Sequence, residues 1–230
     1  TSEFNFNSYD TFIVDEAQRL YIENFRLLAT YISNHREKKM FFFYSIEQTI
    51  RSDTEIGRMI SNFCKTNGKE FSLKKSVRSN IFIVNFINQL CGIKKDKISG
   101  DYLQKYIDVK YFLDVDSAVS WIKMKQNDGY QLITPTGDNY YHASFDKFIG
   151  KVNDFKNTHS AIGSEFNKVV TYLDENVDYN DGHLVKRNRE VYDLASEAYV
   201  NMSRAKNKLA VAVIDNVSLY DYINREILIR

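Results

Sequence analysis

Short apolar runs alternate with longer amphipathic stretches along the chain. Runs of strand length occur at residues 9–14, 39–44, 110–115, 131–134, 168–173 and 208–214. Apolar residues at helical spacing occupy residues 22–34, 55–64, 80–90, 117–125, 190–205 and 218–228. Strands separated by helices predict an α/β protein with a mostly parallel sheet.

Several local signals refine this picture. Asp116 is expected to cap the helix over 117–125, because an aspartate oxygen accepts hydrogen bonds from amides of the first helical turn. A short strand is expected at residues 70–73, and a domain boundary near residues 73–76. The polar stretch 174–189 contains an Asp-Gly pair and predicts an exposed loop.

Composition narrows the class of protein. The 230 residues are 43% hydrophobic and 27% charged, which predicts a folded globular protein. A net charge of +1 shows no basic excess of the kind that marks many nucleic-acid-binding domains. Two cysteines exclude a disulfide scaffold. No apolar run approaches the roughly 20 residues of a membrane span and no signal peptide is visible, so a cytoplasmic protein without membrane association is expected.

An acidic pair follows the first apolar strand. Residues 12–14 lead directly into Asp15, Glu16, Ala17 and Gln18, and the apolar run predicts a parallel strand buried on both faces. Open α/β sheets bind ligands at the carboxyl ends of their strands. In phosphoryl transfer, an aspartate there holds Mg²⁺, and a neighbouring acidic group positions or deprotonates the attacking water. The alternative interpretation is a strand that leaves the core through a polar turn.

Five segments, taken in order, resemble the motifs of superfamily 1 helicases. Residues 15–18 resemble motif II (the Walker B box), 41–48 motif III, 73–79 motif IV, 158–166 motif V and 199–206 motif VI. The shared order and the position at strand ends carry the resemblance more than any single box. The chain looks most similar to UvrD/Rep-like helicases and to the helicase-like domain associated with bacterial Schlafen-type proteins.

This resemblance implies a fold and an activity. The fold would be a RecA-like parallel sheet flanked by helices. Residues 1–73 would form the carboxy-terminal part of one RecA-like domain, and residues 74–230 a complete second one. The activity would be that of an ATP-dependent helicase or translocase on single-stranded DNA or RNA, with ATP and Mg²⁺ bound in the cleft between the two domains.

The resemblance also implies catalytic roles. Asp15 would bind Mg²⁺, Glu16 would activate the hydrolytic water, and Gln48 would sense the γ-phosphate. Arg78 and Arg204 would reach the γ-phosphate from the second domain, where an arginine stabilises the charge of the transferring phosphoryl group. Each side chain also has an ordinary structural explanation, such as a turn residue after a strand or a cation at the carboxyl end of a helix.

Two binding sets complete the resemblance. Gln18, Gly163 and Glu165 would bind the nucleotide, with Glu165 at the ribose and Gly163 allowing close approach of the backbone. Thr158, His159 and Ser160 would lie toward the nucleic-acid strand, where hydroxyls and backbone amides contact phosphates.

The motif set departs from the family pattern in several places, of which the missing P-loop is the largest. No Gly-x-x-x-x-Gly-Lys-Ser/Thr P-loop occurs in the chain. Because the family carries the P-loop ahead of motif II, we interpret the chain as a fragment whose P-loop lies in a missing amino-terminal domain or, as an alternative, on another chain. The chain alone is therefore expected to be inactive. Ser45 replaces the usual aspartate of motif III, and Val77 the usual aromatic residue of motif IV.

Two functions remain open from the sequence. The first is part of an ATP-driven motor, which the retained catalytic side chains favour. The second is a catalytically incomplete nucleic-acid-binding or regulatory module, for example in defence, that keeps the helicase fold. A net charge near zero favours the second, because proteins that track a single strand usually carry a basic groove.

Overall fold

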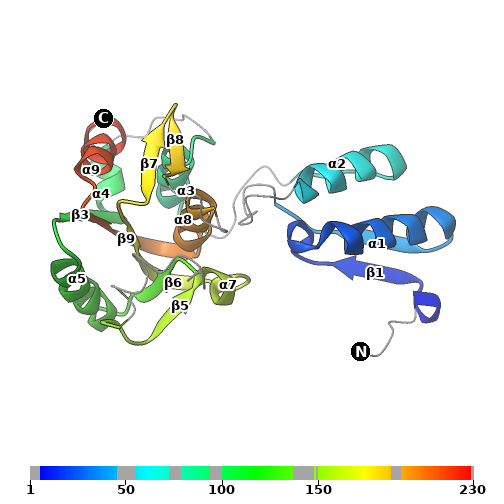
Figure 1. The fold of residues 1–230 in the computed structure, drawn as a ribbon, viewed down its shortest axis with the longest axis horizontal. Helices are drawn as coiled ribbons and strands as arrows, with labels where there is room; N and C mark the ends of the chain where they lie inside the picture. Colours follow the sequence, from blue (N-terminus) through cyan, green and yellow to red (C-terminus); the bar gives the residue numbers. More distant parts are fainter. Residues whose placement is uncertain are drawn as a thin grey trace. The chain divides into compact units, whose positions relative to one another are not determined.

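The chain forms two compact units, residues 1–73 and 74–230 (Figure 1). The computed structural model describes residues 6–45, 55–72, 79–93, 100–136, 148, 150–187 and 193–228. Within these ranges, no helix combines the length and the apolar character needed to cross a membrane.

The first unit is built around two parallel strands. Its elements are a 3₁₀ turn η1 (Phe6–Ser8), β1 (Thr11–Val14), a 3₁₀ turn η2 (Ala17–Arg19), α1 (Ile22–Asn34), β2 (Lys39–Phe42) and α2 (Ile56–Asn67). The strands pair in register, with Phe12 opposite Met40. Helix α1 provides the crossover that a parallel pair requires. A small core of Ala17, Phe25, Ile56 and Ile60 packs beneath the pair.

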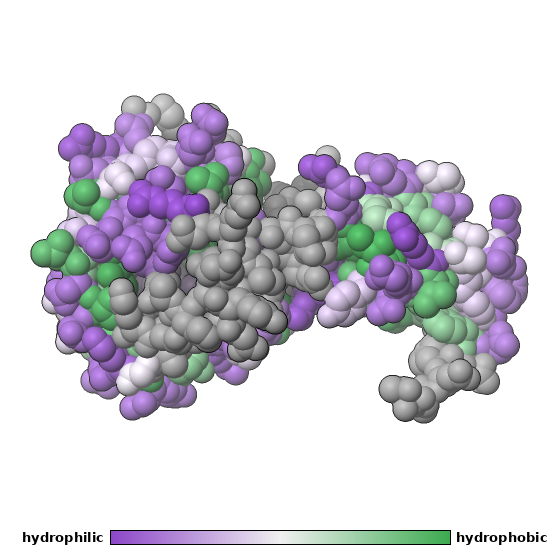
Figure 2. All heavy atoms as spheres, viewed as in Figure 1, coloured by the Kyte–Doolittle hydropathy of each residue, from purple (hydrophilic) through white to green (hydrophobic). Residues whose placement is uncertain are grey.

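Among the described residues of this unit, side chains cover one face of the strand pair and leave the other exposed. Phe12 is buried, whereas its neighbour Ile13 is 69% exposed and Phe41 on β2 is 50% exposed. Successive side chains of a strand point to opposite faces, so the exposed residues share one face. Figure 2 shows hydrophobic residues at the surface of this unit. The expectation of a strand buried on both faces is therefore wrong for this unit alone.

The second unit contains a five-stranded parallel sheet with the strand order β3-β9-β6-β4-β5. Its strands are β3 (Ile107–Phe112), β4 (Gln131–Thr134), β5 (Phe155–Asn157), β6 (Phe166–Leu173) and β9 (Ala205–Ile214). Strand β9, which pairs with β3 on one side and β6 on the other, alternates between two cores: Val211 and Val213 join one, and Ala210 and Ala212 join the other. The predicted α/β fold class with a parallel sheet is confirmed.

Helices cover both faces of this sheet. They are α3 (Ile81–Leu90), α4 (Gly100–Gln104), α5 (Val115–Asn127), α7 (Thr158–Ala161), α8 (Leu194–Ser203), α9 (Val217–Tyr222) and the π-helical turn η4 (Ile223–Leu228). The larger core contains side chains of α3, α8, α9 and η4, and the smaller core contains those of α5. A sheet flanked by helices on both faces is the arrangement of a RecA-like fold.

Helix α5 begins two residues earlier than expected. Asp114, not Asp116, is its N-cap: one carboxylate oxygen accepts from the Ser117 amide at 2.8 Å and the other from the Ser117 hydroxyl at 2.9 Å. These bonds hold the pKa of Asp114 below its ordinary value. Asp116 forms an ion pair with Lys151 at 2.6 Å instead. Asp114 has the extended backbone of an N-cap, whereas Asp116 already lies in the first helical turn.

The stretch 174–189, expected to be an exposed loop, contains an antiparallel hairpin of β7 (Val177–Asn180) and β8 (His183–Lys186). Its turn places Asp181 and Gly182 at positive φ, as the Asp-Gly signal indicates. Val177 and Leu184 are buried against the larger core. The polar character of the surrounding residues concealed these two apolar anchors. The short strand expected at 70–73 is also wrong: residues 70–72 are irregular, and residue 73 lies outside the described ranges.

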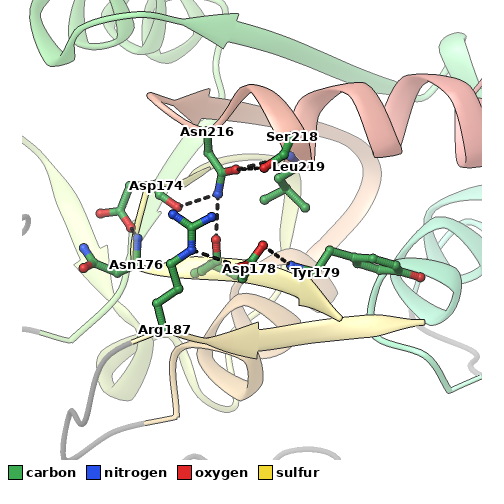
Figure 3. A network of polar contacts seen from close by, with 9 residues as sticks. Asp174, Asn176, Asp178, Tyr179, Arg187, Asn216, Ser218 and Leu219 are labelled. Carbon is green, nitrogen blue, oxygen red and sulfur yellow. Dashed lines mark hydrogen bonds and ion pairs between the residues drawn. The ribbon is translucent and has the colours of Figure 1, made fainter. Parts of the chain in front are cut away.

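Asn216 attaches this hairpin to the end of β9 (Figure 3). Its buried side-chain amide donates to the carbonyls of Asp174, at 3.1 Å, and Val177, at 2.6 Å. Its carbonyl oxygen accepts from the Leu219 amide at 3.2 Å and caps α9. One asparagine therefore joins the sheet, the hairpin and the following helix.

Asn216→Ala is expected to lower the free energy of unfolding by about 2 kcal/mol, because buried backbone groups lose their partner. Urea unfolding followed by fluorescence of Trp121, the only tryptophan, reports on the second unit. Ser218→Ala is the control, since Ser218 is exposed and also contacts Asn216. An unchanged urea midpoint in Asn216→Ala would contradict the anchoring role.

A polar contact ties the end of β2 to α2 in the first unit. The Tyr44 hydroxyl and the Ser61 hydroxyl both donate to Glu70, and Lys65 lies 3.5 Å from the same carboxylate. Burial, reinforced by the bond to Glu70, raises the pKa of Tyr44 to about 12. The same hydrogen bonds hold the pKa of Glu70 below its ordinary value. The carboxylate of Glu70 thus stabilises the chain just before Ser45.

Tyr44→Phe is expected to raise the pKa of Glu70 toward 4.5, its ordinary value. Because the folded-state pKa is lowered, the stabilisation from Glu70 is present above the unfolded-state pKa and is lost as the pH falls through the folded-state pKa. The stability difference between the two proteins should therefore shrink as the solution is acidified. A carbon-13 titration of the Glu70 carboxyl group measures the shift, and an identical titration in both proteins would refute it.

Candidate functional site

The acidic pair lies at the carboxyl end of β1. Asp15 is exposed and its carboxylate accepts from the Glu16 amide at 2.9 Å. Glu16 is half-buried and adopts a left-handed conformation, with φ of 51°. Residues other than glycine rarely occupy this region. The two carboxylates therefore belong to a turn that begins immediately after the strand.

Gln18 joins this turn to the end of β2. Its buried side chain donates to the Glu16 carboxylate at 2.8 Å and accepts from the Ser45 amide at 3.2 Å. The Ala17 amide also donates to the Phe43 carbonyl at 2.8 Å. Since Ser45 takes part through its backbone, the loss of the usual aspartate there leaves this contact intact. The segments that resemble motifs II and III are therefore brought together, while Gln48 lies outside the described residues.

The second unit brings other motif segments together at the amino edge of its sheet. Glu165 precedes β6 and Arg204 precedes β9, and the Phe166 amide donates to the Arg204 carbonyl at 3.0 Å. Lys206 pairs with Glu165 at 2.6 Å. The Asn80 amide donates to the Lys206 carbonyl at 2.8 Å. Segments next to motif IV and within motifs V and VI therefore meet here, while Arg78 lies outside the described residues.

Two of the predicted residues at this edge have distinctive local geometry. Arg204 is only 2% exposed, and its guanidinium donates to the Val200 carbonyl at 3.2 Å and to the Ser203 hydroxyl at 3.1 Å. The side chain thus folds back on the last turn of α8. Gly163 has φ of 77°, and a Cβ there would meet no atom within 4 Å. Backbone conformation rather than lack of space accounts for glycine at this position within the chain.

The predicted nucleic-acid residues lie at the opposite, carboxyl edge, where α7 follows β5. Thr158 is fully buried, and its hydroxyl donates to the Thr134 carbonyl at 3.2 Å. Ser160 is exposed, and its amide donates to the Asn157 side chain at 2.8 Å, which caps α7. His159 lies between them and is half-buried. Motif V therefore crosses from one edge of the sheet to the other.

Two residues that the motif comparison missed join His159 at this edge. The Thr136 hydroxyl lies 2.7 Å from His159 Nδ1, and the Thr136 amide donates to the two oxygens of the Glu197 carboxylate at 3.2 and 3.3 Å. Glu197 is 0% exposed. In the sequence, Thr136 was part of the turn that ends a strand, and Glu197 an unassigned helical residue before motif VI. An acidic residue within an apolar helical face was the available signal.

No group of three His, Cys, Asp or Glu side chains within the described ranges could hold a metal ion. Mg²⁺ in phosphoryl-transfer sites is usually held by one or two carboxylates together with substrate phosphates and water. The exposed carboxylate of Asp15 at the end of β1 fits that kind of coordination. The chemistry of this donor is therefore compatible with the Mg²⁺ expected from the sequence.

Comparison with known proteins identifies the family. The chain matches the family model described as Schlafen group 3, DNA/RNA helicase domain, over residues 3–140. No curated protein matches the chain. The match covers more than half of the 230 residues and includes the acidic pair at the end of β1. It confirms the expected helicase-like domain, and the chain belongs to the Schlafen group 3 DNA/RNA helicase domain family.

Proposed function

We propose that the chain is the carboxy-terminal part of an ATP-dependent superfamily 1 helicase or translocase that acts on single-stranded DNA or RNA. ATP would be hydrolysed at the cleft between two RecA-like domains. The observation that carries this proposal is the acidic turn after β1, in which Gln18 holds Glu16 at 2.8 Å and contacts the backbone of Ser45. Membership of a helicase-domain family supports it.

The two carboxylates of the acidic turn, Asp15 and Glu16, would have different roles. Asp15, exposed at the strand end, would hold Mg²⁺ through water. When bound, Mg²⁺-ATP supplies the transferable phosphoryl group, with its charge partly neutralised by the metal ion. Glu16 would orient and deprotonate the attacking water. The hydrogen bond from Gln18 restricts the Glu16 carboxylate, so its position is set before substrate binds.

The amino edge of the sheet in the second unit would bind the nucleotide. Arg204 and Arg78 would contact the γ-phosphate, and Glu165, beside Gly163, would contact the ribose. Gln48 belongs to the first unit and would sense the γ-phosphate from there. Arg204 would first have to exchange its bonds to Val200 and Ser203 for bonds to phosphate. Such an exchange would make its position depend on the nucleotide state, because only interactions that differ between states drive a change.

The carboxyl edge of the same sheet would bind the single-stranded nucleic acid. The exposed Ser160 and the half-buried His159 stand at the start of α7, where hydroxyl and backbone N–H groups can donate to phosphate oxygens. Thr158 would support this site from inside the protein, because it is buried and its hydroxyl bonds to the backbone of β4. The partner would be single-stranded DNA or RNA.

A further segment would complete the first unit. The exposed apolar side chains of β1 and β2, Ile13 and Phe41, share one face of a parallel strand pair. Parallel sheets are normally covered on both faces. We propose that the segment covering this face carries the P-loop, in the same polypeptide or on another chain.

A second function is favoured by one observation. The guanidinium of Arg204 is buried and bonded within α8, which suits a structural role as well as a catalytic one. The chain would then act as a catalytically incomplete nucleic-acid-binding or regulatory module that keeps the helicase fold.

Single-strand-stimulated ATP hydrolysis separates the two functions. The assay compares the longest natural protein containing this chain with the 230-residue chain alone. Glu16→Gln in the long protein is expected to lower turnover by about 100-fold or more, since a general base contributes about 10²–10⁴. Glu23→Gln, in the first turn of α1, is the matched control and should leave turnover unchanged.

The outcomes have distinct meanings. Strand-stimulated turnover that is lost in Glu16→Gln supports the motor. Normal turnover in Glu16→Gln would remove the acidic turn from the catalytic site. Tight strand binding by the long protein without any turnover would support the regulatory module instead.

A further inference from the structure

A buried carboxylate supports the loop that follows β4. Glu197, on α8, is fully buried, and both of its oxygens lie within hydrogen-bond distance of the Thr136 amide. Burying a carboxylate is unfavourable unless hydrogen bonds compensate for the lost hydration. A contact of this kind fixes the backbone of Thr136 relative to α8.

Thr136 in turn contacts the imidazole of His159. Its hydroxyl lies 2.7 Å from Nδ1, although the residues are 23 positions apart. The parallel pairing of β4 and β5 makes this contact available, because Thr134 is opposite Asn157 and both strands end at the same edge. The path from α8 to the imidazole therefore contains two residues, Glu197 and Thr136.

The backbone around His159 is already held by other contacts. Thr158 bonds to the carbonyl of Thr134, and Asn157 caps α7 through the Ser160 amide. What the Thr136 hydroxyl adds is control of the imidazole itself. A hydrogen bond to one ring nitrogen decides which nitrogen carries the proton and how the ring is oriented.

We propose that Thr136, supported by Glu197, is a positioning residue that orients His159 for contact with a single-stranded nucleic acid. This inference rests on the proposed role of His159 at the strand. It names two residues that the helicase motifs do not include. It also makes the affinity for a single strand depend on a hydroxyl that does not itself have to touch the strand.

The support for His159 comes from the helix that ends at Arg204. Glu197, Asn201 and Arg204 are spaced by four and three residues, so they share one face of α8, and each is at most 2% exposed. Glu197 and Arg204 are separated by about 10 Å along the helix axis. A shift of α8 along its axis would therefore move the support of His159 together with Arg204.

The test measures binding of a fluorescein-labelled 20-nucleotide oligo(dT) to the full 230-residue chain by fluorescence anisotropy. Thr136→Val removes the hydroxyl but keeps the shape, and is expected to raise the Kd about fivefold to tenfold, about 1.4 kcal/mol for tenfold. Thr136→Ser keeps the hydroxyl and should bind within twofold of the wild-type chain. Glu197→Gln should weaken binding less than Thr136→Val.

A double-mutant cycle distinguishes positioning from a general structural role. If Thr136 acts through His159, the double variant Thr136→Val/His159→Ala should bind no more weakly than His159→Ala alone. Nitrogen-15 NMR of the His159 ring gives a readout without nucleic acid. Thr136→Val should shift its nitrogen resonances, and Thr136→Ser should restore them.

Each other outcome overturns a defined claim. Oligo(dT) binding by Thr136→Val equal to that of the wild-type chain would overturn the positioning role and leave the proposed function in place. Additive losses in the double variant, or a loss that serine does not rescue, would overturn the positioning role in the same way. No detectable oligo(dT) binding by the wild-type chain would overturn the strand contact at α7, and the positioning role with it.

Discussion

The parallel pairing of β6 with β9 is the constraint on which the second unit depends. The two strands are joined from Phe166 opposite Ala205 to Leu173 opposite Val213. Parallel strands cannot be joined by a tight turn, so each connection must return across the sheet. Helix α8 returns from the carboxyl to the amino edge before β9, and this places Glu197 and Arg204 at opposite ends of one helix. The separation of the two candidate binding edges follows from this topology.

In the first unit, buried polar contacts organise the candidate site where the apolar core is small. Gln18 is enclosed and satisfies Glu16 and the backbone of Ser45 at the same time. Removing one member would leave another buried polar group without its partner, which costs more than the net value of the bond. These contacts restrict the conformation of the acidic turn. Asp15 remains exposed, so its carboxylate is accessible to a metal ion.

The two units differ in how completely their sheets are covered. Side chains of β9 alternate between two buried cores, so the second unit is covered on both faces. In the first unit Phe12 is buried and Ile13 is exposed. The same type of apolar sequence thus has different surroundings in the two units. This asymmetry supports the proposal that the first unit receives a further segment, whereas the second has its own complete core.

Most of the longer strands and helices and the placement of the acidic pair at a strand end were predictable from the sequence, because periodicity and local motifs are properties of neighbouring residues. The short elements α4, β5 and α7 were not predicted. The hairpin at 177–186 was not, since its anchors Val177 and Leu184 gain their burial from distant parts of the chain. The start of α5 at Val115, which makes Asp114 rather than Asp116 the cap, was also missed. Thr136 and Glu197 share no sequence motif. The parallel pairing of β4 with β5 brings Thr136 to His159, and the packing of α8 brings Glu197 to Thr136. Sequence alone therefore determined most of the longer elements and the acidic turn, while tertiary structure decided which distant polar groups meet, because hydrogen bonds require proximity that chain order does not encode locally.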